Sequence, residues 1–215
     1  MQRGDEVENL QGPMSFDDAI RTRRSVRAFK DEVVPHAALE RAVSLAVQAP
    51  APHHSQPWRF VVIDDHSVKE KFSSTMGAAW RSDLVADELP EKKIEGILSR
   101  SHRLLTSTPT LVVCCADMAD SHDYPDDRRR RAEWSLFAHT VGAALQTFMT
   151  SLATEGVASC WISAPVFCGT VVREFFDLPE TVEPHALVLV GYPSPDYVPR
   201  PRSNPDPSDY IIRGC

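Results

Sequence analysis

Apolar residues recur along this chain at two spacings, one typical of helices and one of buried strands. The sequence predicts strands at four places, 59–63, 110–116, 157–163 and 185–191, and the second of these is a continuous apolar run. Apolar positions three and four residues apart predict a helix over 35–49 and a long helix from Tyr124 to Thr154. The alternation of strands with helices indicates an α+β fold of packed layers.

The long helix carries the strongest pattern, because seven large or apolar residues recur on it at helical spacing. We expect these residues to form core: Trp134, Phe137, Val141, Ala144, Leu145, Phe148 and Leu152. Gly156 is expected to end the helix.

Weaker signals predict the remaining elements. Ser15 is expected to cap a first helix, with Phe16 and Ile20 pointing inward. Residues 66–107 read as two helices, with Trp80-Arg81-Ser82-Asp83 between them and Pro90 opening the second. A short helix over 169–176 and a final strand at Tyr210-Ile211-Ile212 complete the expectation.

The length, composition and charge of the chain limit which folds and functions are possible. A chain of 215 residues with 42% hydrophobic residues suits one domain over 14–215, preceded by a disordered leader or artificial remnant at 1–13. The formal net charge of −7 argues against nucleic-acid binding. Without an apolar run long enough for a bilayer or a signal peptide, we expect no membrane contact and a cytoplasmic location. Five cysteines without CxxC spacing indicate free thiols.

Two short stretches are candidates for chemistry. Arg23-Arg24-Ser25-Val26-Arg27 gathers three guanidinium groups and a hydroxyl, a combination suited to a phosphate or carboxylate. The proline-rich loop at 49–58 carries His53 and His54. Because no third ligand lies near these histidines at helical or hairpin spacing, we expect a polar loop and no metal site.

The two stretches together resemble the nitroreductase family of FMN enzymes. Members carry an Arg-x-Ser-x-Arg/Lys turn about thirty residues before a Pro-Ser-x-x-x-x-Gln-Pro-Trp segment, and this chain has Arg23 to Arg27 followed by residues 50–58. It departs from the pattern in having Ala51 and Pro52 where most members have serines. The resemblance implies a central mixed sheet flanked by helices, FMN as cofactor and an obligate homodimer.

A closer resemblance rests on four blocks of sequence. They are Ala-Pro-Ala-Pro-His-His (49–54), Trp-Arg-Ser-Asp-Leu (80–84), Tyr-Pro-Asp (124–126) and Ser-Cys-Trp-Ile (159–162). These blocks resemble the nitroreductase-like C-terminal domain of the bifunctional coenzyme F-420 γ-glutamyl ligase of actinobacteria. That resemblance implies reduction of the dehydro precursor of F-420, by a stand-alone homologue or an excised domain.

The resemblance also assigns site residues. Those expected to bind FMN are Arg23, Arg24, Ser25, Val26, Arg27, Ala51, Ser163 and Arg202. Ala51 would reach the flavin from the other subunit, and Ser163 would lie near its N5. The deazaflavin-type substrate would contact Trp80, Arg81 and Asp83.

Several questions stay open at this level. The proton donor is unknown, with His54 and solvent as candidates. The electron donor and the true substrate are also unknown. A broad-specificity NAD(P)H nitroreductase and a flavin or deazaflavin binding module without turnover are the alternative functions.

Overall fold

The computed structural model describes residues 14–203 and 205–214. The proposed leader, 1–13, lies outside the described residues. The helices are α1 Phe16–Thr22, α2 His36–Ala46, α3 His66–Ala86, α4 Glu91–Thr106, α5 Asp127–Thr154, α6 Ala164–Phe167 and α7 Gly169–Phe175, with 3₁₀ turns η1 Pro52–His54 and η2 Pro207–Tyr210. The strands are β1 Trp58–Ile63, β2 Thr110–Asp117, β3 Ala158–Ile162 and β4 Val182–Gly191. The expected α+β class is confirmed.

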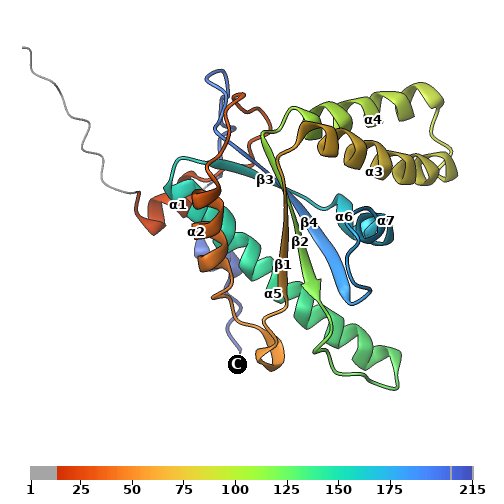
Figure 1. Cartoon of the computed structure of the whole chain (residues 1–215). Coiled ribbons are helices and arrows are strands. Elements are labelled where there is room, and N and C mark those ends of the chain that lie inside the picture. Colours follow the sequence, from red (N-terminus) through yellow and green to blue (C-terminus); the bar gives the residue numbers. More distant parts are fainter. Residues whose placement is uncertain (1–13, 204, 215) are drawn as a thin grey trace, which may run out of the picture.

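The four strands form one sheet in the order β1-β2-β4-β3 (Figure 1). All three ladders are antiparallel, so the expectation of a mixed sheet is wrong for these four strands, whose neighbours all run in opposite directions. A parallel contribution comes from a bridge between Ser25 and Ser159, which joins the arginine turn to β3. The strands β2 and β4 are central and almost fully buried, which explains their continuous apolar sequences.

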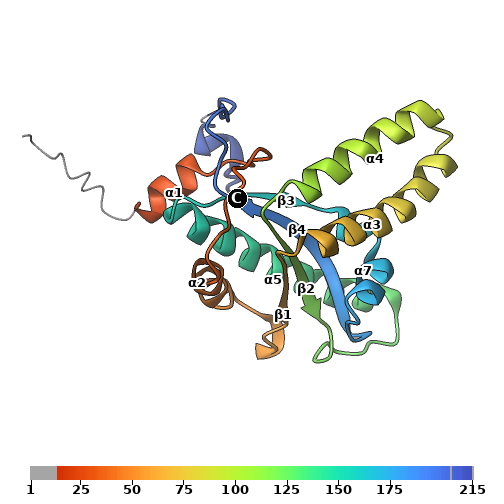
Figure 2. The ribbon, with the colours of Figure 1, turned by 45° about the horizontal axis from the view of Figure 1, so that its top comes forward.

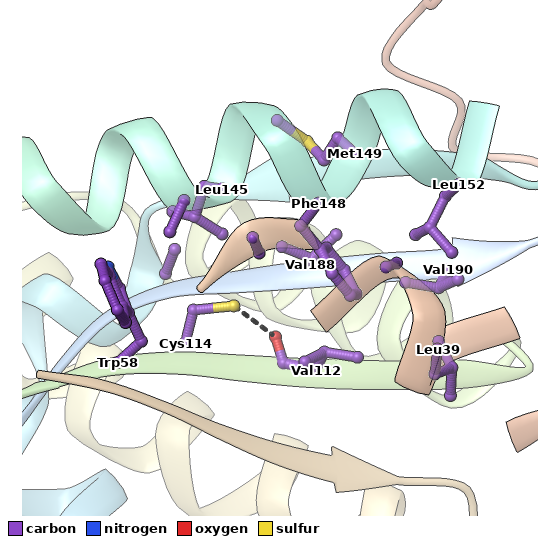
Figure 3. Packing of buried hydrophobic residues seen from close by; sticks show 14 of the residues in the cluster. Leu39, Trp58, Val112, Cys114, Leu145, Phe148, Met149, Leu152, Val188 and Val190 are labelled. Carbon is purple, nitrogen blue, oxygen red and sulfur yellow. Dashed lines mark hydrogen bonds between the residues drawn. The ribbon is translucent and has the colours of Figure 1, made fainter. Parts of the chain in front are cut away.

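Helices cover both faces of the sheet. On one face α2 and α5 pack against alternate residues of β2 and β4, including Val112, Cys114 and Val188 (Figure 3). On the other face the base of α3, the end of α4 and α7 contribute Phe72, Leu105 and Val172. Six of the seven expected core residues of α5 are buried, which confirms the periodicity there.

Local capping sets the limits of α5. The Asp126 carboxylate accepts a hydrogen bond from the Arg129 N–H at 3.0 Å, so it caps the first turn. Gly156, with a φ of +74°, ends the helix as expected, because glycine adopts this conformation without a steric penalty.

The helices α3 and α4 form a hairpin that projects away from the sheet in both views (Figures 1 and 2). The expectation that Trp80-Arg81-Ser82-Asp83 lies between two helices is wrong, because α3 continues through these residues to Ala86. No glycine or proline interrupts α3 there, whereas Pro90 precedes α4 as expected. Buried Leu84 and Ile94 give the hairpin a small core of its own.

Three further expectations are wrong for the single chain. Phe16 is 68% exposed and Trp134 is 42% exposed, so neither is core. The Trp134 indole donates instead to the Glu183 carboxylate at 2.5 Å. Residues 210–212 form no strand: Tyr210 ends η2, Ile211 and Ile212 follow it, and all three side chains are exposed. None of the described helices has the length and apolar character needed to cross a membrane.

Candidate functional site

The arginine turn is fixed to the edge strand β3. The Val26 N–H donates to the Ser159 carbonyl at 3.1 Å, and the Val26 side chain is buried. Ser25 pairs with Ser159 in the parallel bridge. The turn is thereby held beside β3, with Arg23 and Arg24 half-buried and Arg27 exposed.

Positive charge gathers at this place, and no carboxylate of the described residues pairs with it. Burial lowers the pKa of the Arg23 guanidinium, and the neighbouring Arg202 and Arg24 charges lower it further. Among residues 14–203 and 205–214, no carboxylate forms a salt bridge with Arg23, Arg24 or Arg202. The structure therefore brings Arg202 to the turn, as the sequence predicted, and leaves the cluster suited to an anion.

Two buried polar atoms support the same conclusion. Arg24 Nε and Ser159 Oγ are buried and have no hydrogen-bond partner in the described part of the chain. The other end of Arg24 is held in place, since its Nη1 donates to the carbonyl oxygens of Arg21 at 2.7 Å and Arg23 at 3.0 Å. Buried polar groups are nearly always paired, so these atoms indicate a bound group.

A thiol lies beside the same cluster. Burial raises the pKa of Cys160, against the charges of Arg27 and Arg23 and a hydrogen bond with Ser25. Cys160 is therefore a neutral thiol at neutral pH, and it does not supply the missing negative charge.

The expected flavin contacts are spread along β3 and the loop before β1. Ser163 is the N-cap of α6 and is exposed directly after β3. It follows Ser159 by four residues, which is about 13 Å along a strand. Ala51 lies in the loop before η1 and borders a hollow of about 380 Å³ against α5, lined by Pro50, Ala51, Pro52, Leu136, His139, Thr140 and Ala143. Most of these side chains are apolar, which suits a flat ring.

The three residues expected to bind substrate lie on α3, at the opposite side of the molecule from α1 (Figures 1 and 2). Arg81 pairs with Glu91 at 2.6 Å and with Glu95, so its charge is already neutralised. Trp80 is partly exposed, and Asp83 lies close enough to Cys168 to raise the pKa of that thiol, after the larger effect of burial. Within one chain, the structure does not bring these residues to the arginine cluster.

The loop before β1 has contacts that the sequence did not reveal. His53 Nε2 lies 2.9 Å from the Glu133 carboxylate, and the His53 ring stacks on His122. The two partners follow His53 by 69 and 80 positions, and no local spacing signals such a pairing. His54, the candidate proton donor, is exposed.

The sequence matches a protein-family model over most of its length. A model described as "Nitroreductase family" matches residues 20–192, most of the chain. Iodotyrosine deiodinase 1 of Mus musculus is 25% identical over 203 residues, covering 89% of this chain and 66% of that protein. The chain thus spans just under two thirds of the length of that relative. The Bacillus subtilis (strain 168) protein YfhC, named as a candidate NAD(P)H nitroreductase, is 25% identical over 188 residues, 87% of this chain and 89% of YfhC.

Solved structures share the fold. A BluB-like flavoprotein from Clostridium difficile 630 superposes with a TM-score of 0.75 at 22% identity, covering 94% of this chain and all of that one. Oxidized iodotyrosine deiodinase bound to FMN and 3-iodo-L-tyrosine gives a TM-score of 0.68 at 20% identity, covering 93% and 98%. Family match and fold agree, and the chain belongs to the nitroreductase family.

Proposed function

We propose that this protein is an FMN-dependent oxidoreductase. The observation that carries the proposal is the arginine cluster beside β3, where the crowded guanidinium groups and the Arg24 Nε have no negative partner among the described residues. A nucleotide phosphate supplies that charge and accepts several hydrogen bonds at once. When bound, FMN would supply the hydride or electrons that the side chains of this protein lack.

The residues present fit FMN. Arg23, Arg24 and Arg202 would hold the phosphate, with Arg27 and the Ser25 hydroxyl beside the ribityl chain. Val26 would act indirectly, because its burial and its hydrogen bond to Ser159 fix the turn. Ser163 would present a backbone N–H to the ring from the far end of β3.

We propose that a partner chain contributes the other side of the flavin-binding site. Ala51 and its hollow face α5, and large apolar side chains remain exposed nearby on α5, β3 and α6: Trp134, Leu136, Trp161, Val166 and Phe167. A soluble chain rarely exposes so many large apolar groups without a partner. A homodimer would cover them and bring Ala51 against the flavin of the other subunit.

Fluorescence titration of FMN into the protein stripped of flavin tests the cofactor. We expect saturable binding of one FMN per chain, with a dissociation constant at or below the micromolar range. A protein that takes up no FMN at micromolar concentration contradicts the proposal.

For the substrate, we propose the dehydro precursor of coenzyme F-420, whose conjugated double bond would accept the hydride. Trp80 offers a partly exposed ring for stacking on a deazaflavin, and Asp83 offers a carboxylate for its N–H or hydroxyl groups. Arg81 contributes less than its charge suggests, because Glu91 and Glu95 already bind it. It lines a hollow of about 410 Å³ between α3 and α4.

Titrating F-420 into the wild type and Asp83→Ala tests this assignment. We expect Asp83→Ala to weaken binding, whereas Asp87→Ala, one turn further along α3, serves as the matched control. If the wild type and Asp83→Ala bind F-420 equally, or if neither binds it, residues 80–83 do not form the substrate-binding site.

A broad NAD(P)H nitroreductase is the second candidate, favoured by the match to YfhC across 89% of that protein. Stopped-flow mixing of the FMN-loaded protein with NADH or NADPH separates the alternatives. Rapid bleaching followed by reoxidation with a nitroaromatic favours this second candidate. No reduction by either donor favours a binding module without turnover.

A further inference from the structure

Three side chains that are far apart in the sequence meet at one end of the sheet. His53 lies in η1, His122 lies in the loop between β2 and α5, and Glu133 lies on the second turn of α5. Their possible ligand atoms all lie within 4.8 Å of one another. Figures 1 and 2 show that η1, this loop and the start of α5 gather below the ends of β1 and β2.

The contacts within this cluster are close. His53 Nε2 lies 2.9 Å from Glu133 Oε1, and the backbone N–H of His122 donates to the same oxygen at 2.9 Å. The imidazole rings of His53 and His122 stack with 3.8 Å between their centroids and 23° between their planes. Two imidazoles and a carboxylate therefore share one small volume.

Glu133 supplies a fixed negative charge. Its side chain is only 5% exposed. The His122 N–H and the His53 ring both lie 2.9 Å from Glu133 Oε1 and hold the carboxylate in place. A cation placed among the three groups would interact favourably with the carboxylate and with both ring nitrogens.

We propose that His53, His122 and Glu133 bind a divalent transition-metal ion, with Zn²⁺ as the best match. Imidazole nitrogen and carboxylate oxygen are common Zn²⁺ ligands, with bonds of about 2.0–2.2 Å. Tetrahedral bonds of that length put ligand atoms about 3.3–3.5 Å apart. The separations here range from 2.9 Å to at most 4.8 Å, a difference that small side-chain rotations cover.

Surrounding groups orient two of the ligands. The His122 N–H holds the Glu133 carboxylate in place, as hydrogen bonds do for metal-binding carboxylates. The Tyr124 hydroxyl lies 3.5 Å from His122 Nδ1, where it favours binding of a metal through the other ring nitrogen. The fourth coordination position would go to water, because three protein ligands leave it open.

The backbone at His53 is consistent with a fixed ligand. His53 and His54 have φ values of 55° and 56°, a conformation that costs about 1–3 kcal/mol per residue unless contacts enforce it. The bound ion would join the loop that carries Ala51 to α5. This proposal replaces the expectation of no metal site, which considered only ligands close to the histidines in sequence.

Calorimetric titration of ZnCl₂ into the tag-free, FMN-loaded protein is the test. We expect one ion per chain with a micromolar or tighter dissociation constant. His122→Ala and Glu133→Gln should each weaken binding at least tenfold. The matched control is His66→Ala, because His66 and Glu70 form a pair at 3.4 Å and no third ligand joins them among the described residues. This variant should bind Zn²⁺ like the wild type.

Two further measurements distinguish the loss of a metal ligand from a defect in folding. His122→Ala removes an exposed side chain, so it should fold normally even if Glu133→Gln does not, and circular dichroism checks this. X-ray absorption of the Zn²⁺ complex should show two nitrogen neighbours and one carboxylate oxygen. Absence of saturable binding, unchanged affinity in His122→Ala, or equal affinity for Mg²⁺, which prefers oxygen ligands, would overturn the proposal. None of these results depends on the proposed substrate.

Discussion

At the scale of single residues, the arginine cluster predicts which side chains hold the FMN phosphate. Arg202→Ala should weaken FMN binding by about 1.5–3 kcal/mol, the contribution of hydrogen bonds to a charged group. The fold should be unaffected, because Arg202 is exposed and lies outside the core. Arg24→Ala should have a similar effect on FMN, with some loss of stability because its Nη1 also holds two carbonyl groups at the end of α1.

Fluorescence titration of FMN measures both variants. Arg200→Ala is the matched control, since Arg200 is an exposed arginine two positions away and no contact places it in the cluster. If both Arg202→Ala and Arg24→Ala bind FMN as tightly as the wild type, the phosphate site lies elsewhere in the protein.

His185 predicts a dependence of stability on pH. Burial lowers the pKa of its imidazole, against a smaller opposing effect of Glu183, and its Nε2 has no partner in the described part of the chain. The unfolded chain takes up this proton near the ordinary value of about 6.5, before the folded chain does. The free energy of unfolding therefore falls as the pH drops from about 6.5 to the lowered pKa of the folded state.

His185→Phe should remove this dependence while keeping a ring against Trp134, which now stacks on His185 at 5.4 Å. We expect the thermal midpoint of the variant to change less than that of the wild type between about pH 7.5 and pH 5. His36→Phe, at an exposed position, is the control. Equal pH dependence in wild type and His185→Phe would contradict the prediction.

Residue-level prediction from the sequence succeeded where the signal is local. The cluster of Arg23, Arg24 and Arg27 could be read from five consecutive letters, and Arg202 from the family resemblance. The partners of His53 could not be found, because contacts over 69 and 80 positions leave no periodic trace. Trp134 was misplaced because helical spacing cannot distinguish a face buried in the chain from a face that is left exposed.

At the scale of elements, the junction of β4 and the tail depends on one glycine. A Cβ on Gly191 would lie 2.9 Å from Phe29 Cδ1 and 3.1 Å from Pro109 Cδ, closer than side-chain carbons normally approach. Gly191→Ala should therefore destabilise the protein by about 1–3 kcal/mol. Gly77→Ala is the control, because a Cβ there meets no atom within 4 Å.

Urea unfolding measures both glycine variants. Gly77 lies inside α3, so its replacement by alanine should raise stability by about 0.5–1 kcal/mol. A Gly191→Ala protein as stable as the wild type would show that Phe29 and Pro109 move aside without cost.

Elements were predictable where composition and length agree. Predicted stretches of five to seven residues matched all four strands, and Pro90 and Gly156 marked helix ends correctly. The limits of α3 were missed, because Trp80-Arg81-Ser82-Asp83 reads as a polar connection although its residues tolerate a helix. The apparent strand at 210–212 has β-branched residues but no neighbouring strand in the described structure to pair with.

At the scale of the whole molecule, we predict a yellow homodimer of twice the 24.0 kDa chain mass. Phe167→Asp should reduce both dimer formation and FMN content, because Phe167 is 82% exposed in the single chain and would be covered in the dimer. Light scattering after gel filtration and the flavin absorption spectrum measure the two effects.

Val85→Asp is the control for this substitution. Val85 is also exposed and apolar, but it lies on the projecting end of α3, away from α5 and α6. It should leave mass and flavin content unchanged. A wild-type protein that is a colourless monomer and takes up no FMN would contradict the dimer and the cofactor together.

The position of the α3–α4 hairpin in the chain has a consequence for protein engineering. Its two ends meet at Ile63 and Leu111, which face each other across β1 and β2, so the sheet closes whatever length lies between them. Phe72, Met76 and Leu105 at its base belong to the core and must remain. The stretch from Gly77 to Leu104 is thus a segment that could be exchanged between relatives without changing the sheet. Under the substrate role proposed for Trp80 and Asp83, the exchange would transfer substrate preference.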